Sequence, residues 1–113
     1  MDKTVLGLTE KITIFSSSHF KKEVLARIDT GATNSSIDMA LAGELMLGPI
    51  KRTKLVKSAS GKGRRAIILV KVKLDGKVLE DEFTVAERGH MTYPVLIGQN
   101  ILKKGSFLID PNK

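Results

Sequence analysis

The stretch Leu25-Ala26-Arg27-Ile28-Asp29-Thr30-Gly31-Ala32 is an apolar run that ends in an acid, a hydroxyl and a glycine. A carboxylate at the end of a buried strand costs free energy unless another group hydrogen-bonds to it or pairs with it. Thr30 can make a local hydrogen bond through its hydroxyl, and Gly31 lets another backbone come close. We therefore expect Asp29 to have a chemical role, although Asp-Thr-Gly also suits an ordinary turn.

A second stretch, near the other end of the chain, strengthens the chemical interpretation. It reads Tyr93-Pro94-Val95-Leu96-Ile97-Gly98-Gln99-Asn100-Ile101-Leu102, which predicts an apolar strand that runs through a glycine into a short helix. Together the two stretches resemble the retropepsins, the retroviral-type aspartic proteases, in which an Asp-Thr-Gly-Ala loop packs against a later apolar-Gly-Arg-Asn/Asp-apolar-Leu segment. Their order and spacing match that family, and the resemblance covers roughly residues 12–110.

The length and composition of the chain set limits on its organisation. It has 113 residues with 42% hydrophobic content, so we expect residues 1–113 to form a single retropepsin-like domain. The absence of cysteine excludes a disulfide framework and a cysteine-based zinc site. The N-terminus carries no signal-peptide hydrophobic region, and no apolar run approaches the roughly 20 residues of a membrane span. The expectation is a soluble cytoplasmic protein with no membrane partner.

The net charge of the chain favours an anionic partner. It is +7, from 19 Lys and Arg against 12 Asp and Glu, which would suit nucleic acid or an acidic peptide. Aromatic residues make up only 4% of the chain, so nucleic-acid bases would find few side chains on which to stack. Nucleic acid is therefore not the partner that we expect, and solvated surface charge is the commonest explanation of such an excess.

Short strands are predicted along most of the chain. Alternating or apolar runs mark them at residues 11–15, 22–28, 35–37, 53–58, 66–74, 77–85, 93–97 and 107–109. One helix is predicted at 39–47, with Asp38 as its N-cap and Gly48-Pro49 as its stop, and another near 100–104. This pattern predicts an all-β fold with one or two short helices, arranged as a small closed or partly closed barrel of the acid-protease type.

Two hairpins are predicted between these strands. Asp75-Gly76 is the strongest hairpin signal, because both central positions of a type I′ turn need positive φ. Across this turn Lys71 and Lys73 are expected to face acids on a solvated side of the sheet. The segment 57–66 contains a glycine-bearing polar tip between two strands. By resemblance to the retropepsins it is the flap that folds over bound peptide, and a plain exposed hairpin is the alternative.

The chemistry of acid proteases has a consequence for the assembly. Peptide hydrolysis needs two carboxylates about 3 Å apart that share one proton, so that one acts as base toward water while the other donates to the scissile carbonyl. The chain has a single Asp-Thr-Gly, so a second copy must supply the other carboxylate. A two-fold symmetric homodimer follows, with Asp29 and its symmetry mate at the axis.

The resemblance implies roles for individual residues. Asp29, Thr30 and Gly31 are expected to be catalytic, with Thr30 hydrogen-bonding across the axis and Gly31 offering its carbonyl to the substrate backbone. Ala32 would line the adjoining pocket. A peptide or protein substrate would lie extended between this loop and the flap, and no cofactor is implied. The substrate-binding residues expected in the flap are Ser60, Gly61, Lys62 and Gly63.

Two positions depart from the retropepsin pattern. Retropepsins usually carry an acid directly after Asp-Thr-Gly-Ala and an arginine after the later glycine, and these form an ion pair near the dimer interface. Here the two positions are Thr33 and Gln99, which are both neutral. A hydrogen bond between them could replace the ion pair, and the dimer would then be weaker or differently arranged.

A closer resemblance is to the retropepsin-like family known as ATP-dependent zinc proteases, found alone or joined to ATP-grasp enzymes similar to the ligases that add glutamate to ribosomal proteins. The features that carry it are Gly7-Leu8-Thr9-Glu10, residues 28–36 and residues 96–111. This resemblance implies an ATP-grasp ligase as a partner. No metal is expected, because the chain lacks cysteine and a His-Glu-x-x-His motif, and His19 and His90 fall in separate loops.

Two functions from different classes remain open. One is an aspartic endopeptidase that acts as a homodimer, and the other is a non-catalytic retropepsin-like module that dimerises or binds an extended peptide beside an ATP-grasp ligase. A requirement for Asp29 in peptide cleavage would separate them. The flap also predicts a preference for acidic peptides, since residues 51–74 contain no acid and its basic side chains are Lys57, Lys62, Arg64 and Arg65.

Overall fold

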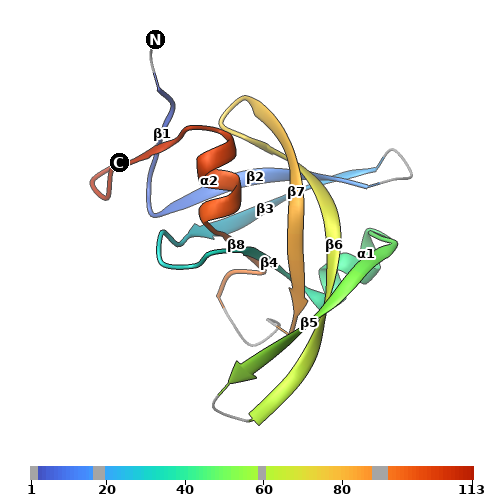
Figure 1. Ribbon diagram of the computed structural model, residues 1–113. Coiled ribbons are helices and arrows are strands. Elements are labelled where there is room, and N and C mark those ends of the chain that lie inside the picture. Colours follow the sequence, from blue (N-terminus) through green and yellow to red (C-terminus); the bar gives the residue numbers. More distant parts are fainter. Residues whose placement is uncertain (1–2, 17–19, 59–60, 88–91) are drawn as a thin grey trace.

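The main element of the structure is a closed β-barrel (Figure 1). The computed structural model describes residues 3–16, 20–58, 61–87 and 92–113. The prediction of a mostly-β closed barrel with short helices is confirmed, because β2 also pairs with β6 and the sheet closes into a six-stranded ring with β5 outside it. The seven strands of this sheet lie in the order β2 (Thr9–Phe15), β3 (Lys21–Ile28), β8 (Val95–Ile97), β4 (Ser35–Asp38), β7 (Lys77–Ala86), β6 (Gly61–Leu74) and β5 (Ile50–Ser58).

The remaining elements flank the barrel. The helix α1 (Met39–Glu44) follows β4, and α2 (Gln99–Lys104) follows β8. A separate two-stranded sheet is formed by the parallel pair β1 (Val5–Leu6) and β9 (Leu108–Ile109), which the sequence pattern only partly indicated. Figure 1 shows β1 and β9 on the side of the barrel where α2 lies. Neither helix in the described part of the chain is long and apolar enough to cross a membrane.

The hydrophobic core fills the inside of the barrel. In β2, Ile12 and Ile14 are buried while Lys11 is exposed, which is the period of two expected for a strand with one face inside. Ile101 places α2 over the core. The core is therefore continuous from the barrel to this helix, and its largest fully buried side chains are Phe83, Leu6, Ile12, Ile14, Ile37, Leu74, Ile97 and Ile101.

The turn between β6 and β7 has the conformation that the sequence predicts. Asp75 has φ 47° and Gly76 has φ 84°, so both central residues are left-handed, as a type I′ turn requires. Leu74 pairs with Lys77 directly across the turn. A two-residue loop of this type fixes the register of the whole β6–β7 ladder.

That register makes the expected row of lysines opposite acids only half correct. Lys71 lies opposite Glu80, as expected, but Lys73 lies opposite Val78. The reason is that the acids of β7 begin at Glu80, so the lysine nearer the turn has no acid across from it.

The hairpin of β5 and β6 is longer than the sequence predicts. β5 begins at Ile50 rather than at residue 53, and β6 begins at Gly61 rather than at residue 66. Arg64 lies opposite Leu55, so much of the predicted polar tip is paired strand. Glycine and arginine suggested a loop, but a hairpin that is exposed on its faces tolerates polar residues in both strands.

The helix α1 begins where the sequence predicts. Asp38 is its N-cap, with extended backbone, and its Oδ2 accepts a hydrogen bond from the Leu41 N–H at 3.4 Å. This bond satisfies one of the N–H groups that the first turn of a helix leaves without an intrahelical partner. The start of the helix is thus fixed by the residue that also ends β4.

The end of α1 corrects the prediction. The helix stops at Glu44 instead of residue 47, and Gly48 is not its C-cap glycine. Met46 takes the left-handed conformation, with φ 51°, and donates its N–H to the Gly43 carbonyl at 3.1 Å. The Leu47 N–H donates to the Ala42 carbonyl at 2.9 Å. These two bonds form a Schellman motif in which a methionine holds the position that glycine usually takes.

Candidate active site

The ends of β3 and β8 lie side by side where Asp29 leaves the barrel. The two strands are parallel, with Ile28 opposite Ile97. Directly after β3, the Asp29 N–H donates to the Ile97 carbonyl at 2.9 Å. Ile28 is buried and Asp29 is half-buried, so the strand is anchored in the core while the acid reaches the surface. The parallel pair therefore determines where the carboxylate is presented.

We call residues 29–34 the Asp29 loop, and its own backbone holds the carboxylate. Asp29 Oδ1 accepts a hydrogen bond from the Gly31 N–H at 2.9 Å, and the Asp29 carbonyl accepts one from the Ala32 N–H at 3.3 Å. Thr30 and Gly31 are exposed. The loop thus fixes one carboxylate oxygen while the residues next to it stay accessible to a partner or a substrate.

Gly98 is the point at which the later segment passes against the Asp29 loop. A Cβ at this position would lie 2.4 Å from the Asn34 carbonyl oxygen and 2.8 Å from that of Ala32. Real Cβ atoms do not come so close to backbone atoms, so only glycine fits here. On the C-terminal side, the Gln99 N–H donates to the Ala32 carbonyl at 2.7 Å. The two stretches that the sequence singled out therefore pack backbone to backbone.

Two polar side chains, the buried Ser35 and the half-buried Asn100, brace the same contact. Ser35 Oγ donates to Asn100 Oδ1 at 2.8 Å and accepts a hydrogen bond from the Gly98 N–H at 2.9 Å. Asn100 Nδ2 donates to the Glu82 carbonyl at 2.8 Å, which ties the segment to β7. Sequence reasoning missed both residues as positioning groups. The only sequence signal for them is that each is a polar residue close to one of the two motifs: Ser35 follows the Asp29 loop, and Asn100 lies two residues after Gly98.

The hydrogen bond expected between Thr33 and Gln99 has a different form in the structure. Gln99 Nε2 donates to the Thr30 carbonyl at 2.8 Å, inside the Asp29 loop. Thr33 is exposed, and its carbonyl accepts from the Asn100 N–H at 3.2 Å. A neutral amide therefore bridges the two motifs where retropepsins usually have an ion pair.

Only some of the predicted flap residues lie within the described part of the chain. Ser60 lies outside the described residues, as does the side chain of Lys62, while Gly61 begins β6 opposite Ser58. Gly63 is exposed, and a Cβ on it would meet nothing within 4 Å. Among the described residues, no hydrogen bond or ion pair joins these positions to the Asp29 loop. Their role in binding substrate stays a prediction.

A small hollow connects the Asp29 loop with the base of the β5–β6 hairpin. It has a volume of about 120 Å³, and its lining includes Asn34 of the loop together with Arg52 and Lys54 of β5. Arg52 forms an ion pair with Glu82, so Lys54 is the cation of this hollow without an ion-pair partner in the described part of the chain. The space next to the loop is thus bordered by positive charge.

The structure offers little to a metal ion in the part of the chain that it describes. Within residues 3–16, 20–58, 61–87 and 92–113, no three His, Cys, Asp or Glu side chains gather closely enough to form a metal site. His19 and His90 lie outside the described residues. The prediction that no metal takes part stays a prediction.

Three solved structures show where this fold is found. A protein of unknown function from Legionella pneumophila, Lpg0085 (DUF785), matches with a TM-score of 0.69 and 19% identity over 99% of this chain and 96% of that one. Simian foamy virus protease matches with a TM-score of 0.62 and 18% identity over 84% and 91% of the two chains. EIAV protease, solved with the inhibitor HBY-793, gives 0.66 and 20% over 85% of each chain. The fold is therefore that of retroviral proteases.

Sequence comparison identifies the family more directly. No functionally curated protein matches the chain. The family model described as RimB-like, for the retropepsin-like aspartic endopeptidase RimB, matches residues 41–113, which is more than half of the chain. The matched part contains the β5–β6 hairpin and the Gly98 segment. The chain therefore belongs to the RimB-like family of retropepsin-like aspartic endopeptidases.

Proposed function

We propose that this protein hydrolyses peptide bonds as a two-fold symmetric homodimer in which each subunit contributes Asp29. The observation that carries the proposal is the geometry of the Asp29 loop. The carboxylate follows β3 directly after its buried last residue, Ile28, its Oδ1 accepts from the Gly31 N–H at 2.9 Å, and Thr30 and Gly31 are exposed. A carboxylate fixed in place and open on one side can approach a second one.

The second carboxylate comes from the second subunit in this proposal. Two carboxylates about 3 Å apart cannot both ionise, so they share a proton and act as acid and base toward the peptide bond and a water molecule. Asp29 of each subunit forms this pair, Thr30 hydrogen-bonds across the axis, and Gly31 receives the substrate backbone. Because one chain carries a single Asp-Thr-Gly, neither subunit is active alone.

A hollow beside Thr30, whose lining combines apolar side chains with Lys3 and Lys103, supports a dimer on this face. It has a volume of about 410 Å³, and its lining includes Thr30, Gln99, Leu102 and Ile109. It therefore runs from the Asp29 loop across α2 to β9. A partner that covered it would bury apolar surface in the same step that brings the two carboxylates together.

We also propose that acidic peptides are the preferred substrates. The β5–β6 hairpin borders the hollow next to Asn34 with Arg52 and Lys54, and Arg64 and Arg65 lie further along it. Two such hairpins over one peptide would repel each other, and carboxylates on the substrate would reduce that repulsion.

The replacement Asp29→Asn tests the peptidase proposal. It keeps the size of the side chain and removes the ionisable group, so peptide cleavage between about pH 3 and 7 should fall by at least about 100-fold. Asp75→Asn is the matched control, because Asp75 is an exposed carboxylate in a turn whose positive φ asparagine tolerates. Cleavage that survives in Asp29→Asn, or cleavage by a strictly monomeric protein, would contradict the proposal.

The same experiment can distinguish the peptidase from a second candidate, a non-catalytic module that binds extended peptides. One observation favours it: the family match covers residues 41–113 and leaves out the Asp29 loop. If the wild-type protein cuts no peptide of a random library at any pH in this range, yet binds peptides equally well with and without Asp29→Asn, the module is the better description.

A further inference from the structure

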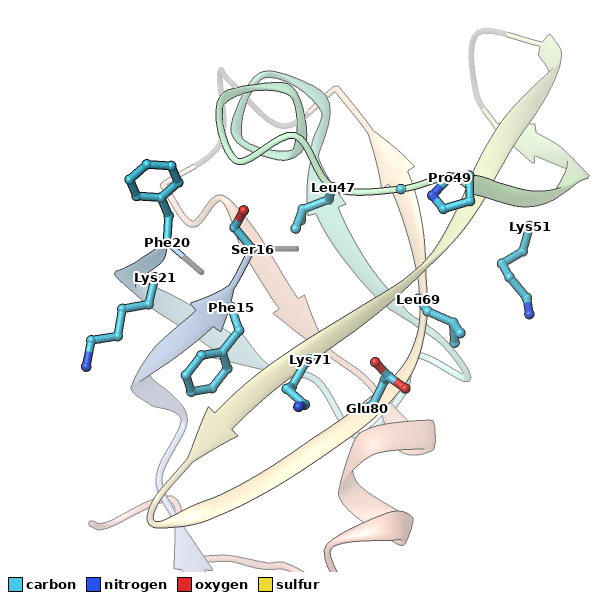
Figure 2. A pocket seen from close by; sticks show the side chains of 11 residues that line it. Phe15, Ser16, Phe20, Lys21, Leu47, Pro49, Lys51, Leu69, Lys71 and Glu80 are labelled. Carbon is cyan, nitrogen blue, oxygen red and sulfur yellow. The ribbon is translucent and has the colours of Figure 1, made fainter. Parts of the chain in front are cut away.

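A groove in the barrel wall, distinct from the Asp29 loop, has no role in the proposed peptidase function. It has a volume of about 700 Å³, within the range of about 300–1,000 Å³ that is usual for ligand sites. No residue of the Asp29 loop or of α2 lines it. We call it the seam groove; the lining residues that matter for its chemistry are the apolar Phe15, Phe20 and Leu69 and the cationic Lys21, Lys51 and Lys71 (Figure 2).

The seam groove exists because β6 changes its neighbour along one edge. β6 pairs with β5 as far as Ile68, which lies opposite Ile50, and with β2 from Lys71, which lies opposite Phe15. Leu69 is in the interval between the two partners, and it lines the groove together with the end of β2 and the start of β5. The break between two strands therefore leaves a hollow that the chain does not fill.

The apolar part of the groove is exposed, and a backbone hydrogen bond holds the chain at one of its residues. Phe20 is 64% exposed and Leu69 is 39% exposed. The backbone at Phe20 is held, because its carbonyl accepts a hydrogen bond from the Ser16 N–H at 2.7 Å. A solvent-exposed aromatic side chain on a concave surface is a typical anchor point for a protein partner.

The charged part of the groove is positive. Lys21, Lys51 and Lys71 stand against a single acid, Glu80, so the lining has three positive charges and one negative. Figure 2 shows the three lysines spread across the groove from Lys21 to Lys51, with Lys71 and Glu80 between them. Among the described residues none of the three lysines has an ion pair. The groove is therefore complementary to an anionic segment.

We propose that the seam groove docks an acidic segment of a partner protein, in which an apolar anchor residue is flanked by carboxylates. The anchor packs on Phe15, Phe20 and Leu69, and the carboxylates on either side approach the lysines. The concave form suits the side chains of a peptide better than a flat lipid surface. This site goes beyond the proposed peptidase function, since the segment binds away from Asp29 and is not cut.

Binding of a designed peptide tests the proposal. The probe is a decapeptide with Leu-Phe at its centre and glutamates on both sides, measured by fluorescence anisotropy against the full chain carrying Asp29→Asn, which prevents cleavage. The double replacement Lys21→Glu with Lys51→Glu, and separately Phe20→Ser, should each weaken binding about tenfold. The double replacement Lys11→Glu with Lys73→Glu makes the same charge change at two exposed positions outside the groove and should leave the affinity within about twofold.

The location of the bound peptide completes the test. Amide chemical shifts should change at the end of β2, at the start of β5 and at Leu69. A peptide with Ser-Ser in place of Leu-Phe should bind at least about tenfold more weakly. Shifts confined to the Asp29 loop and to residues 53–66 of the β5–β6 hairpin, no binding at all, or equal binding of the Ser-Ser peptide would overturn the proposal. So would a change of oligomeric state in Phe20→Ser, which would make the groove an interface between copies. None of these results depends on whether the protein is a peptidase.

Discussion

At Gly98, the space that a side chain would need is filled by the backbone of the Asp29 loop. The Gly98 backbone is extended, with φ −103° and ψ −170°, a conformation that residues with side chains also adopt. The need for glycine is therefore a matter of space and not of dihedral angle. The contact also helps to position the proposed catalytic carboxylate, because Ala32 and Asn34, which Gly98 contacts, belong to the same loop as Asp29.

We expect Gly98→Ala to lower the free energy of unfolding by about 1–3 kcal/mol, since the added methyl group must displace the backbone of the loop. The matched control is Gly43→Ala in α1, which adds the same group where a Cβ would meet nothing within 4 Å. There the better helix propensity of alanine should stabilise the protein by up to about 1 kcal/mol. Urea denaturation of both variants measures the difference, and equal stability of Gly98→Ala and the wild type would contradict the packing.

Single residues also show how far the sequence can be read without a structure. Asp29 and Gly98 stand out because each follows an apolar run and breaks it. Ser35 and Asn100 do not stand out, because their hydrogen bond joins positions 65 residues apart and leaves no local pattern. The left-handed Met46 was missed for the opposite reason, since the nearby Gly48 offered a stronger local signal for the end of the helix.

The β5–β6 hairpin is the element on which substrate preference depends in our proposal. It combines exposed cations with a position next to the hollow at Asn34, so its charge acts on whatever lies beside the Asp29 loop. Since these cations are exposed, salt screens them: the Debye length falls from about 14 to about 4 Å between 0.05 and 0.5 M. A preference that arises from the hairpin must therefore weaken as salt is added.

Competition between two matched peptides measures this preference. At about 0.05 M salt we expect a glutamate-rich peptide to be cleaved or bound several-fold better than the same peptide with lysines, and the advantage to shrink at about 0.5 M. Lys54→Glu should reduce it, whereas Lys11→Glu, the same change on β2, should not. Equal or better use of the lysine peptide at low salt would rule out the acidic preference, without bearing on catalysis itself.

Among the elements, those with a strong local pattern were predictable and those without one were not. The alternation of β2 and the Asp75-Gly76 turn indicated strands and their register directly. The closure of the barrel by β2 and β6 rests on pairs such as Ile12 with Leu74, far apart in the chain, and could only be inferred from the family resemblance. The strand β1 has two residues, which is too short for any periodicity, whereas β9 lies within the strand predicted at residues 107–109.

At the scale of the whole molecule, the side of the barrel that carries β1 and β9 exposes several large apolar side chains. Val5, Leu8 and Leu108 are 37%, 47% and 51% exposed. An isolated two-stranded sheet is at best marginally stable, and each of these strands has one edge with no partner in the described chain. A second subunit that covered this side would complete the sheet and the proposed active site together.

The parallel pairing of β1 with β9 also affects the order in which parts of the chain fold and unfold. It joins the two ends of the described chain, so it can form only when the barrel between them is in place, and few hydrogen bonds hold it. The amide protons of Leu108 and Asp110, which donate to Thr4 and Leu6, should therefore exchange with deuterium much faster than that of Val72 in the barrel. If dimers form over this sheet, the exchange of these two protons will slow as protein concentration rises, while that of Val72 will change far less.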